Sequence, residues 1–175
     1  MTNYDIIYEY AADNYGLITT DAAKRLAIPN VELAKLASRG RLSRIGYGVY
    51  RVAHYIPTAY DKYAEAVALV GSGAAIYGES VLAMHGLALV NPTLMYIATQ
   101  GRVRRTLPAY IRTVFPKTEY SVTEYEGIPS QNVFDAIVVC KNTVMSDRLV
   151  EATREAERQG LITSVEAKTA RKQLQ

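Results

Sequence analysis

The stretch Thr19–Val52 reads TTDAAKRLAIPNVELAKLASRGRLSRIGYGVYRV, and it decides the fold that the sequence predicts. Apolar residues recur at helical spacing over residues 21–26 and again over residues 31–38. Between these segments, Pro29 disfavours a helical conformation for the residue before it, and Asn30 is a suitable cap for the second helix. We therefore expect two short helices joined by a tight turn.

A hairpin is predicted directly after the two helices. Residues 41–45 and 49–52 alternate as strands on either side of Tyr47. The flanking glycines, Gly46 and Gly48, are both expected to allow the positive φ of a tight hairpin turn. Two helices followed by a two-stranded hairpin are typical of a winged helix-turn-helix domain, which we assign to residues 1–56.

Basic residues are concentrated in the same stretch. Residues 24–51 contain seven Lys or Arg and one acid, Glu32, which gives +6, whereas the whole chain carries +3, so the remainder sums to −3. A local excess of basic residues is typical of a nucleic-acid-binding surface. The alternative on charge alone is a solvated charged face.

The second helix and the hairpin supply the predicted contacts. Val31, Leu33 or Ala34, and Ala37 are expected to face the core of the domain, which leaves the polar side chains outward. Outward side chains of a helix can read base edges, and side chains of the hairpin can contact phosphate and sugar. A winged helix can also bind protein alone. The predicted DNA-binding residues are Thr20, Asn30, Glu32, Lys35, Ser38, Arg39, Arg41, Arg44, Tyr47 and Arg51.

Residues 57–175 are predicted to form a mixed α/β C-terminal domain, so the chain as a whole is expected to be α+β. Pro57 lies in a short segment that separates the two parts. Apolar and β-branched runs predict strands over 94–98, 111–115 and 120–125. Helical periodicity predicts helices over 60–70, 80–85, 130–137, 145–159 and 164–174.

Three further features lie outside residues 19–52: an arginine cluster, a histidine and a cysteine. Arg102, Arg104 and Arg105 could form a second basic patch that contacts phosphate or a partner, or a solvated hairpin tip. His85 is expected to end a short helix, where a partly cationic ring would meet the terminal carbonyls. Cys140 is the only cysteine and lies in an apolar run, which favours a buried, inert thiol.

An enzymatic alternative rests on three residues. Asp135, Glu166 and Lys168 resemble the acid…Glu-x-Lys arrangement of metal-dependent nucleases, in which carboxylates hold Mg²⁺ beside the attacked phosphate. However, Glu166 and Lys168 are two residues apart in a predicted helix and therefore point in different directions. We expect no catalytic site, no metal and no cofactor.

We expect neither a signal peptide nor a membrane-spanning helix. The N-terminus has acidic residues and no basic segment of the kind that begins a signal peptide. No run approaches the roughly 20 apolar residues of a membrane-spanning helix. We expect a soluble, cytoplasmic protein.

Three landmarks occur in order along the chain. They are GLITT (16–20) with LASRGRL (36–42) and GYGVYRV (46–52), then YGESVLAMHGL (77–87), then GIPS (127–130) with FDA (134–136). In this order they resemble the AbiEi-type antitoxins, whose N-terminal domain is a winged helix-turn-helix. The likeness extends over most of the chain.

The resemblance implies the antitoxin of a type IV toxin–antitoxin, or abortive infection, system. Such an antitoxin represses its own promoter by binding inverted repeats. The cognate toxin resembles a nucleotidyltransferase, and antitoxin and toxin need not form a stable complex.

Overall fold

The computed structural model describes residues 1–175 as two compact units. The first consists of residues 1–72 and 104–107, and the second of residues 73–103 and 108–175. The first unit contains a three-stranded sheet and the second a five-stranded sheet, and both carry helices. The chain is therefore of mixed α+β class, as the sequence predicted.

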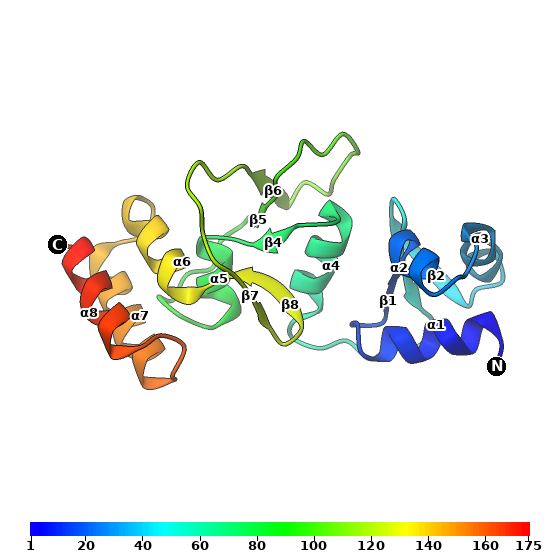
Figure 1. Cartoon of the computed structure of the whole chain (residues 1–175), viewed down its shortest axis with the longest axis horizontal. Helices are drawn as coiled ribbons and strands as arrows, with labels where there is room; N and C mark the ends of the chain where they lie inside the picture. Colours follow the sequence, from blue (N-terminus) through cyan, green and yellow to red (C-terminus); the bar gives the residue numbers. More distant parts are fainter. The chain divides into compact units, whose positions relative to one another are not determined.

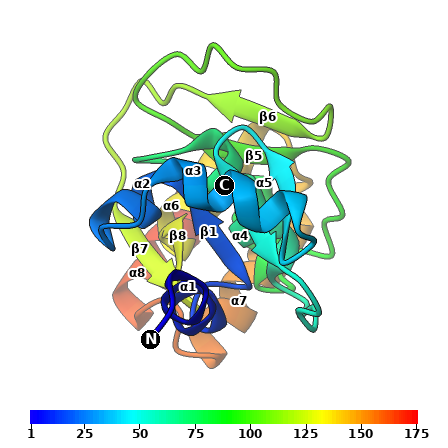
Figure 2. The same ribbon diagram turned by 90° about the vertical axis from the view of Figure 1, so that its right-hand side faces the viewer.

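The first unit contains the two helices and the hairpin that the sequence predicted. Its sheet has the order β1-β3-β2, and all three strands are antiparallel. Helix α2 contacts α3, and α1 contacts both β1 and β3. Figure 2 looks along α1 and shows α2 and α3 following each other. The elements are α1 (Asn3–Ala12), β1 (Leu17–Thr19), α2 (Thr20–Arg25), α3 (Asn30–Ser38), β2 (Leu42–Gly46), β3 (Val49–Val52) and α4 (Asp61–Val70).

The start of α2 follows the sequence expectation, whereas the start of α3 does not. The Thr19 side chain accepts a hydrogen bond from the backbone N–H of Ala22 (3.0 Å), which caps α2. The cap position of α3 is held by Pro29, and the Pro29 carbonyl accepts from the N–H of Glu32 (2.9 Å). The prediction of Asn30 as the cap was therefore wrong, because Asn30 already has a place in the first turn of the helix.

Leu33 anchors α3 in the core of the first unit. It is fully buried in a cluster with Ile7 and Ile18, and Leu36 and Ala37 pack against that cluster. The expectation that Val31 faces inward was wrong, since its side chain is 57% exposed. Residues two apart on a helix point in opposite directions, so Val31 and Leu33 cannot both face the core.

The two glycines of the hairpin have different functions. Gly48 has φ +66°, and its carbonyl accepts from the N–H of Thr20 (2.9 Å). Gly46 belongs to β2 and is not among the residues with positive φ, contrary to expectation. A Cβ at Gly46 would overlap Cδ2 of Leu69 in α4, so a larger residue here would require the Leu69 side chain to move.

Helix α4 packs as part of the first unit. A carboxylate oxygen of Asp61 accepts from the Tyr55 hydroxyl (3.1 Å) and from the N–H of Thr58 (2.8 Å), which ties residues 55–58 to the start of α4. Arg51 of β3 pairs with Glu65 of α4 at 2.9 Å. The sequence predicted the boundary after residue 56, but the first compact unit continues to Ser72.

The second unit has a mixed sheet of order β6-β5-β4-β8-β7, in which β4–β8 and β5–β6 are parallel pairs. The three predicted strands are present. The sequence missed β4, which has only two residues, and β8, which contains Pro129. The strands are β4 (Ala75–Ile76), β5 (Met95–Ala98), β6 (Ile111–Val114), β7 (Val122–Tyr125) and β8 (Ile128–Gln131).

The helices of the second unit form successive layers beside this sheet. Helix α5 contacts β5 and α6, and α6 contacts the α7–α8 pair (Figure 1). The buried residues of α7 and α8 include Ala152, Ala156, Ala167 and Ala170, whose small side chains let the helices approach closely. None of the helices is both long and apolar enough to span a bilayer. The helices are α5 (Glu79–Met84), α6 (Val133–Val139), η1 (Cys140–Asn142), α7 (Ser146–Arg158) and α8 (Ser164–Gln173).

Cys140 is buried in the second unit, and His85 is partly buried there. Cys140 is 2% exposed, and burial raises the pKa of its thiol to about 12, so it is the inert thiol that the sequence predicted. Burial lowers the pKa of His85 to about 4, and its ring lies 4.0 Å from that of Tyr125, centroid to centroid. The expected cationic ring at the end of α5 was therefore wrong, because the partly buried imidazole is neutral at pH 7.

The Arg51–Glu65 pair is expected to stabilise the first unit. Arg51 is 22% exposed at its side chain, and its Nε and Nη2 have no hydrogen-bond partner in the protein. Glu65→Ala should lower the free energy of unfolding by about 1–2 kcal/mol, because it leaves a mostly buried guanidinium without its counterion. Urea denaturation measures this change. Glu32→Ala is the matched control in the same unit, and its more exposed pair with Lys35 should contribute about 0.5 kcal/mol or less. Equal losses in the two variants would contradict this role for Glu65.

Stability should also depend on pH through His85. The pKa of this group falls from 6.5 in a free side chain to about 4 in the fold. Between these values the unfolded chain binds a proton that the folded chain does not, so stability is full above pH 6.5 and decreases as the pH falls toward 4. Urea midpoints across this range should fall less steeply for His85→Gln than for the wild type. His54→Asn, at an exposed position, is the control and should keep the wild-type slope.

Candidate nucleic-acid interface

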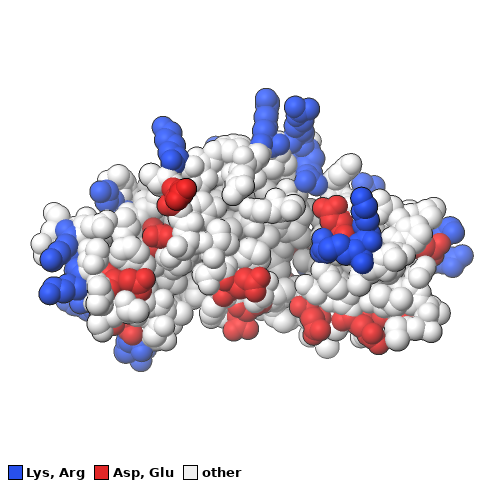
Figure 3. Space-filling view, viewed as in Figure 1, with Lys and Arg blue, Asp and Glu red and all other residues white.

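Helix α3 presents one exposed face. Because Leu33, Leu36 and Ala37 pack inward, the opposite side of the helix is left to solvent. Figure 3 shows basic side chains over α2 and α3. The exposed residues on α3 and at its C-terminal end are Asn30, Val31, Ala34, Lys35, Ser38 and Arg39.

Four polar residues that were predicted on this helix are exposed, and one is only partly so. Glu32 is half-buried, and its carboxylate lies 3.0 Å from the Lys35 ammonium one helical turn away. This contact places an acid beside the cation and reduces the local positive charge. The Ser38 hydroxyl donates to the Lys35 carbonyl (2.8 Å), which leaves the hydroxyl oxygen able to accept. Arg39 follows the last turn and is exposed.

The hairpin adds three exposed side chains. The Arg41 guanidinium lies over the ring of Tyr4 of α1, 4.6 Å from the ring centroid. The Nε of Arg44 donates to the Gly46 carbonyl (3.3 Å), which orients this side chain along the hairpin. Tyr47 at the tip is 67% exposed. Together these residues place two cations and an aromatic ring with a hydroxyl on the surface of the unit.

Two predicted contact residues are less accessible. Thr20 is half-buried, and its Oγ1 lies 2.8 Å from where a Cβ would stand on Gly48. Thr20 therefore packs between the start of α2 and the hairpin tip. Arg51 points toward Glu65 of α4 and has Tyr55 nearby, with the guanidinium 5.7 Å from the ring centroid. The structure thus brings Arg51 to α4, away from the exposed cations.

The predicted basic patch at residues 102–105 divides between the two units. Arg104 and Arg105 belong to the first unit, whereas Arg102 belongs to the second. The Nη2 of Arg105 donates to the Val70 carbonyl at the end of α4 (3.2 Å). The same guanidinium lies 5.4 Å from the centroid of the Tyr47 ring. Arg105 therefore lies at the hairpin tip, far from it in sequence.

Val31, which the sequence predicted to face the core, and Ala34, which it gave as an alternative to Leu33, are both exposed apolar residues. They lie on the same face of α3 as Lys35, and small apolar side chains at such positions can contact the methyl group of thymine. The signal that could have found them is the spacing of Leu33, Leu36 and Ala37, which defines the opposite face.

Helix α1 differs in charge from α2 and α3 in the first unit. Helix α1 and the residue after it carry Asp5, Glu9 and Asp13 and no basic residue. The acidic side chains lie along α1, away from the basic side chains over α2 and α3 (Figure 3). Hydrogen bonds from Thr2 lower the pKa of Asp5 and keep this carboxylate charged. An anionic ligand would therefore approach the side of α3 and the hairpin.

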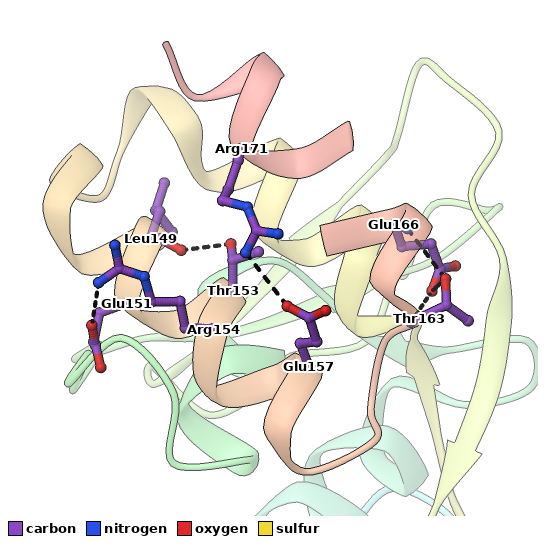
Figure 4. A network of polar contacts seen from close by, with 8 residues as sticks. All are labelled: Leu149, Glu151, Thr153, Arg154, Glu157, Thr163, Glu166 and Arg171. Carbon is purple, nitrogen blue, oxygen red and sulfur yellow. Dashed lines mark hydrogen bonds and ion pairs between the residues drawn. The ribbon is translucent and has the colours of Figure 1, made fainter. Parts of the chain in front are cut away.

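The residues of the nuclease alternative have structural partners instead. One carboxylate oxygen of Asp135 accepts from the N–H of Ser121 (3.0 Å). Glu166 forms a capping box with Thr163 at the start of α8, accepting from its N–H at 2.8 Å (Figure 4). Lys168 is exposed. No three His, Cys, Asp or Glu side chains come together as a metal-binding group.

Comparison with known proteins finds a family similarity for part of the first unit. No curated protein matches the chain. Residues 5–53 match the family model described as transcriptional regulator, AbiEi antitoxin. The match begins in α1 and ends directly after β3, so it contains both helices and the hairpin. Residues 5–53 of this protein are therefore similar to the transcriptional regulators of the AbiEi antitoxin family.

Proposed function

We propose that the first unit is a winged helix-turn-helix domain and that the protein is a promoter-binding repressor and the antitoxin of a type IV toxin–antitoxin system. The observation that carries this proposal is the exposed basic face of α3 and the hairpin inside the region that matches the regulator family. In this assignment α3 is the recognition helix, and the β2–β3 hairpin is the wing.

Helix α3 would enter the major groove with its exposed face toward the bases. Lys35 and Arg39 have the donors that recognise guanine O6 and N7. Val31 and Ala34 would contact thymine methyl groups, and Asn30 and Ser38 can pair with base edges or phosphates.

The wing would contact the DNA backbone. Arg41 and Arg44 supply cations for phosphates, and the Tyr47 hydroxyl can donate to a phosphate or sugar oxygen. Contacts of this kind set the orientation of the domain on the duplex and carry no sequence information. Arg51 would stabilise the domain through Glu65 and make no DNA contact.

The regulatory part of the proposal follows from the family. The operator would be an inverted repeat in the protein's own promoter, bound by two copies of the chain on half-sites related by a two-fold axis. The protein would act in the cytoplasm without a cofactor. The second unit would carry the antitoxin activity, counteracting a nucleotidyltransferase-like toxin without a stable complex.

Substitutions on α3 and in the wing should weaken DNA binding in different ways. Lys35→Ala and Arg39→Ala are each expected to cost about 1–3 kcal/mol of binding free energy on DNA from the protein's own upstream region and to relax base preference. Arg44→Ala should weaken binding to specific and scrambled duplexes alike and reduce the slope of log affinity against log salt by about 1. Fluorescence anisotropy over a range of salt concentrations measures both effects.

Arg154→Ala is the matched control for these variants. It removes one positive charge from an exposed pair in the second unit and should leave affinity and salt slope unchanged. A reporter under the same upstream DNA should be repressed by the wild type and derepressed by Arg39→Ala. Wild-type protein that binds no upstream DNA, or binding that is independent of salt, would refute the proposed function.

A further inference from the structure

A segment distant in sequence lies at the tip of the wing. Residues 104–107 lie between β5 and β6 of the second unit but pack with the first unit. Within this segment the Arg105 guanidinium contacts two different elements. It donates from Nη2 to the Val70 carbonyl of α4 (3.2 Å), and it lies over the Tyr47 ring of the wing, 5.4 Å from the centroid.

The end of α4 is shaped to accept this guanidinium. The last carbonyls of a helix have no partner within the helix and carry partial negative charge, so they favour a cation. Gly71 follows Val70 with φ +112°, and a Cβ there would lie 2.8 Å from the Arg105 Nη2. The absence of a side chain at Gly71 therefore leaves the space that Arg105 occupies.

The wing tip is also held through its backbone. The Gly48 carbonyl accepts from the N–H of Thr20, which holds the backbone of the tip beside α2. That bond does not orient the Tyr47 ring, which is 67% exposed. A side chain with so much freedom loses conformational entropy when it binds, unless a neighbour already restricts it.

We propose that Arg105 is a positioning residue that orients Tyr47 for contact with the DNA backbone, so that the wing is completed by a second segment of the chain. This inference rests on the proposed DNA-binding function. The anchor at Val70 fixes the guanidinium, and the guanidinium in turn restricts the Tyr47 ring. A planar guanidinium stacks on a ring and donates in its own plane at the same time, which a lysine ammonium cannot do.

The inference predicts that the shape of the Arg105 side chain matters more than its charge. Arg105→Ala should weaken operator binding about two- to fivefold, which is the fold-change that an exposed cation–π contact of ordinary strength represents. Arg105→Lys should lose nearly as much, although it keeps the positive charge. Arg102→Ala is the matched control, because it removes a cation of the same loop that belongs to the second unit.

The test combines hydrogen exchange of the free protein with DNA affinity. In the absence of DNA, amides of residues 43–50 should exchange faster in Arg105→Ala and Arg105→Lys than in the wild type and Arg102→Ala. In DNA binding, Tyr47→Ala should weaken affinity, and adding Arg105→Ala to Tyr47→Ala should cause little further loss, because both residues act through the same ring. This non-additivity is a readout that a general loss of positive charge does not produce.

Two results would overturn the inference. Full recovery of affinity and exchange by Arg105→Lys would show that charge alone matters. Additive losses in Tyr47→Ala and Arg105→Ala would show that Arg105 does not act through Tyr47. Failure of the proposed function differs from these two results, because wild-type protein would then bind no upstream DNA. In that case, hydrogen exchange over residues 43–50 would still report whether Arg105 holds the hairpin tip.

Discussion

The ion pair between Arg51 and Glu65 is the contact on which the arrangement of the first unit depends. It joins the middle of β3 to α4 at 2.9 Å, with both side chains largely removed from water. Leu69 of α4 packs closely on Gly46 at the other end of the hairpin, so α4 supports the hairpin along its length. Burying a guanidinium is costly unless it is paired, and Glu65 supplies that pairing from a helix outside the region that matches the family. Helix α4 is therefore part of the domain that carries the candidate interface.

Packing within the first unit also determines which cations are exposed to a ligand. Leu33 fixes the rotation of α3, and this rotation leaves Lys35 and Arg39 outward while Glu32 remains beside Lys35. The ion pair with Glu65 removes Arg51 from the exposed set, and Arg105 joins that set from a distant loop. The surface is therefore less basic along β3, and more basic at the hairpin tip, than the sequence of residues 19–52 alone predicts. Acidic residues on α1 add to this asymmetry and favour approach of an anion from the side of α3.

The two carboxylates of the nuclease alternative have structural contacts in the second unit. Asp135 and Glu166, the carboxylates that resemble a nuclease pattern, accept backbone hydrogen bonds from Ser121 and Thr163 and so help to fix a loop and a helix start. The α7–α8 pair joins through small buried residues and the contact between Glu157 and Arg171 (3.4 Å), which Figure 4 shows beside the Thr163 cap. The family match does not extend to this unit.

The sequence by itself determined the local elements and the position of the basic stretch. Spacing of apolar residues predicted the two helices, the hairpin and the charged C-terminal helices, because these patterns act over a few residues, and the local excess of cations identified the basic stretch. Only the tertiary structure decided where individual side chains point. The outward direction of Val31, the burial of Arg51, the close packing at Gly46 and the place of Arg105 all depend on partners at least 14 residues away or on which face of a helix the core selects. Local propensity contains no information about such partners.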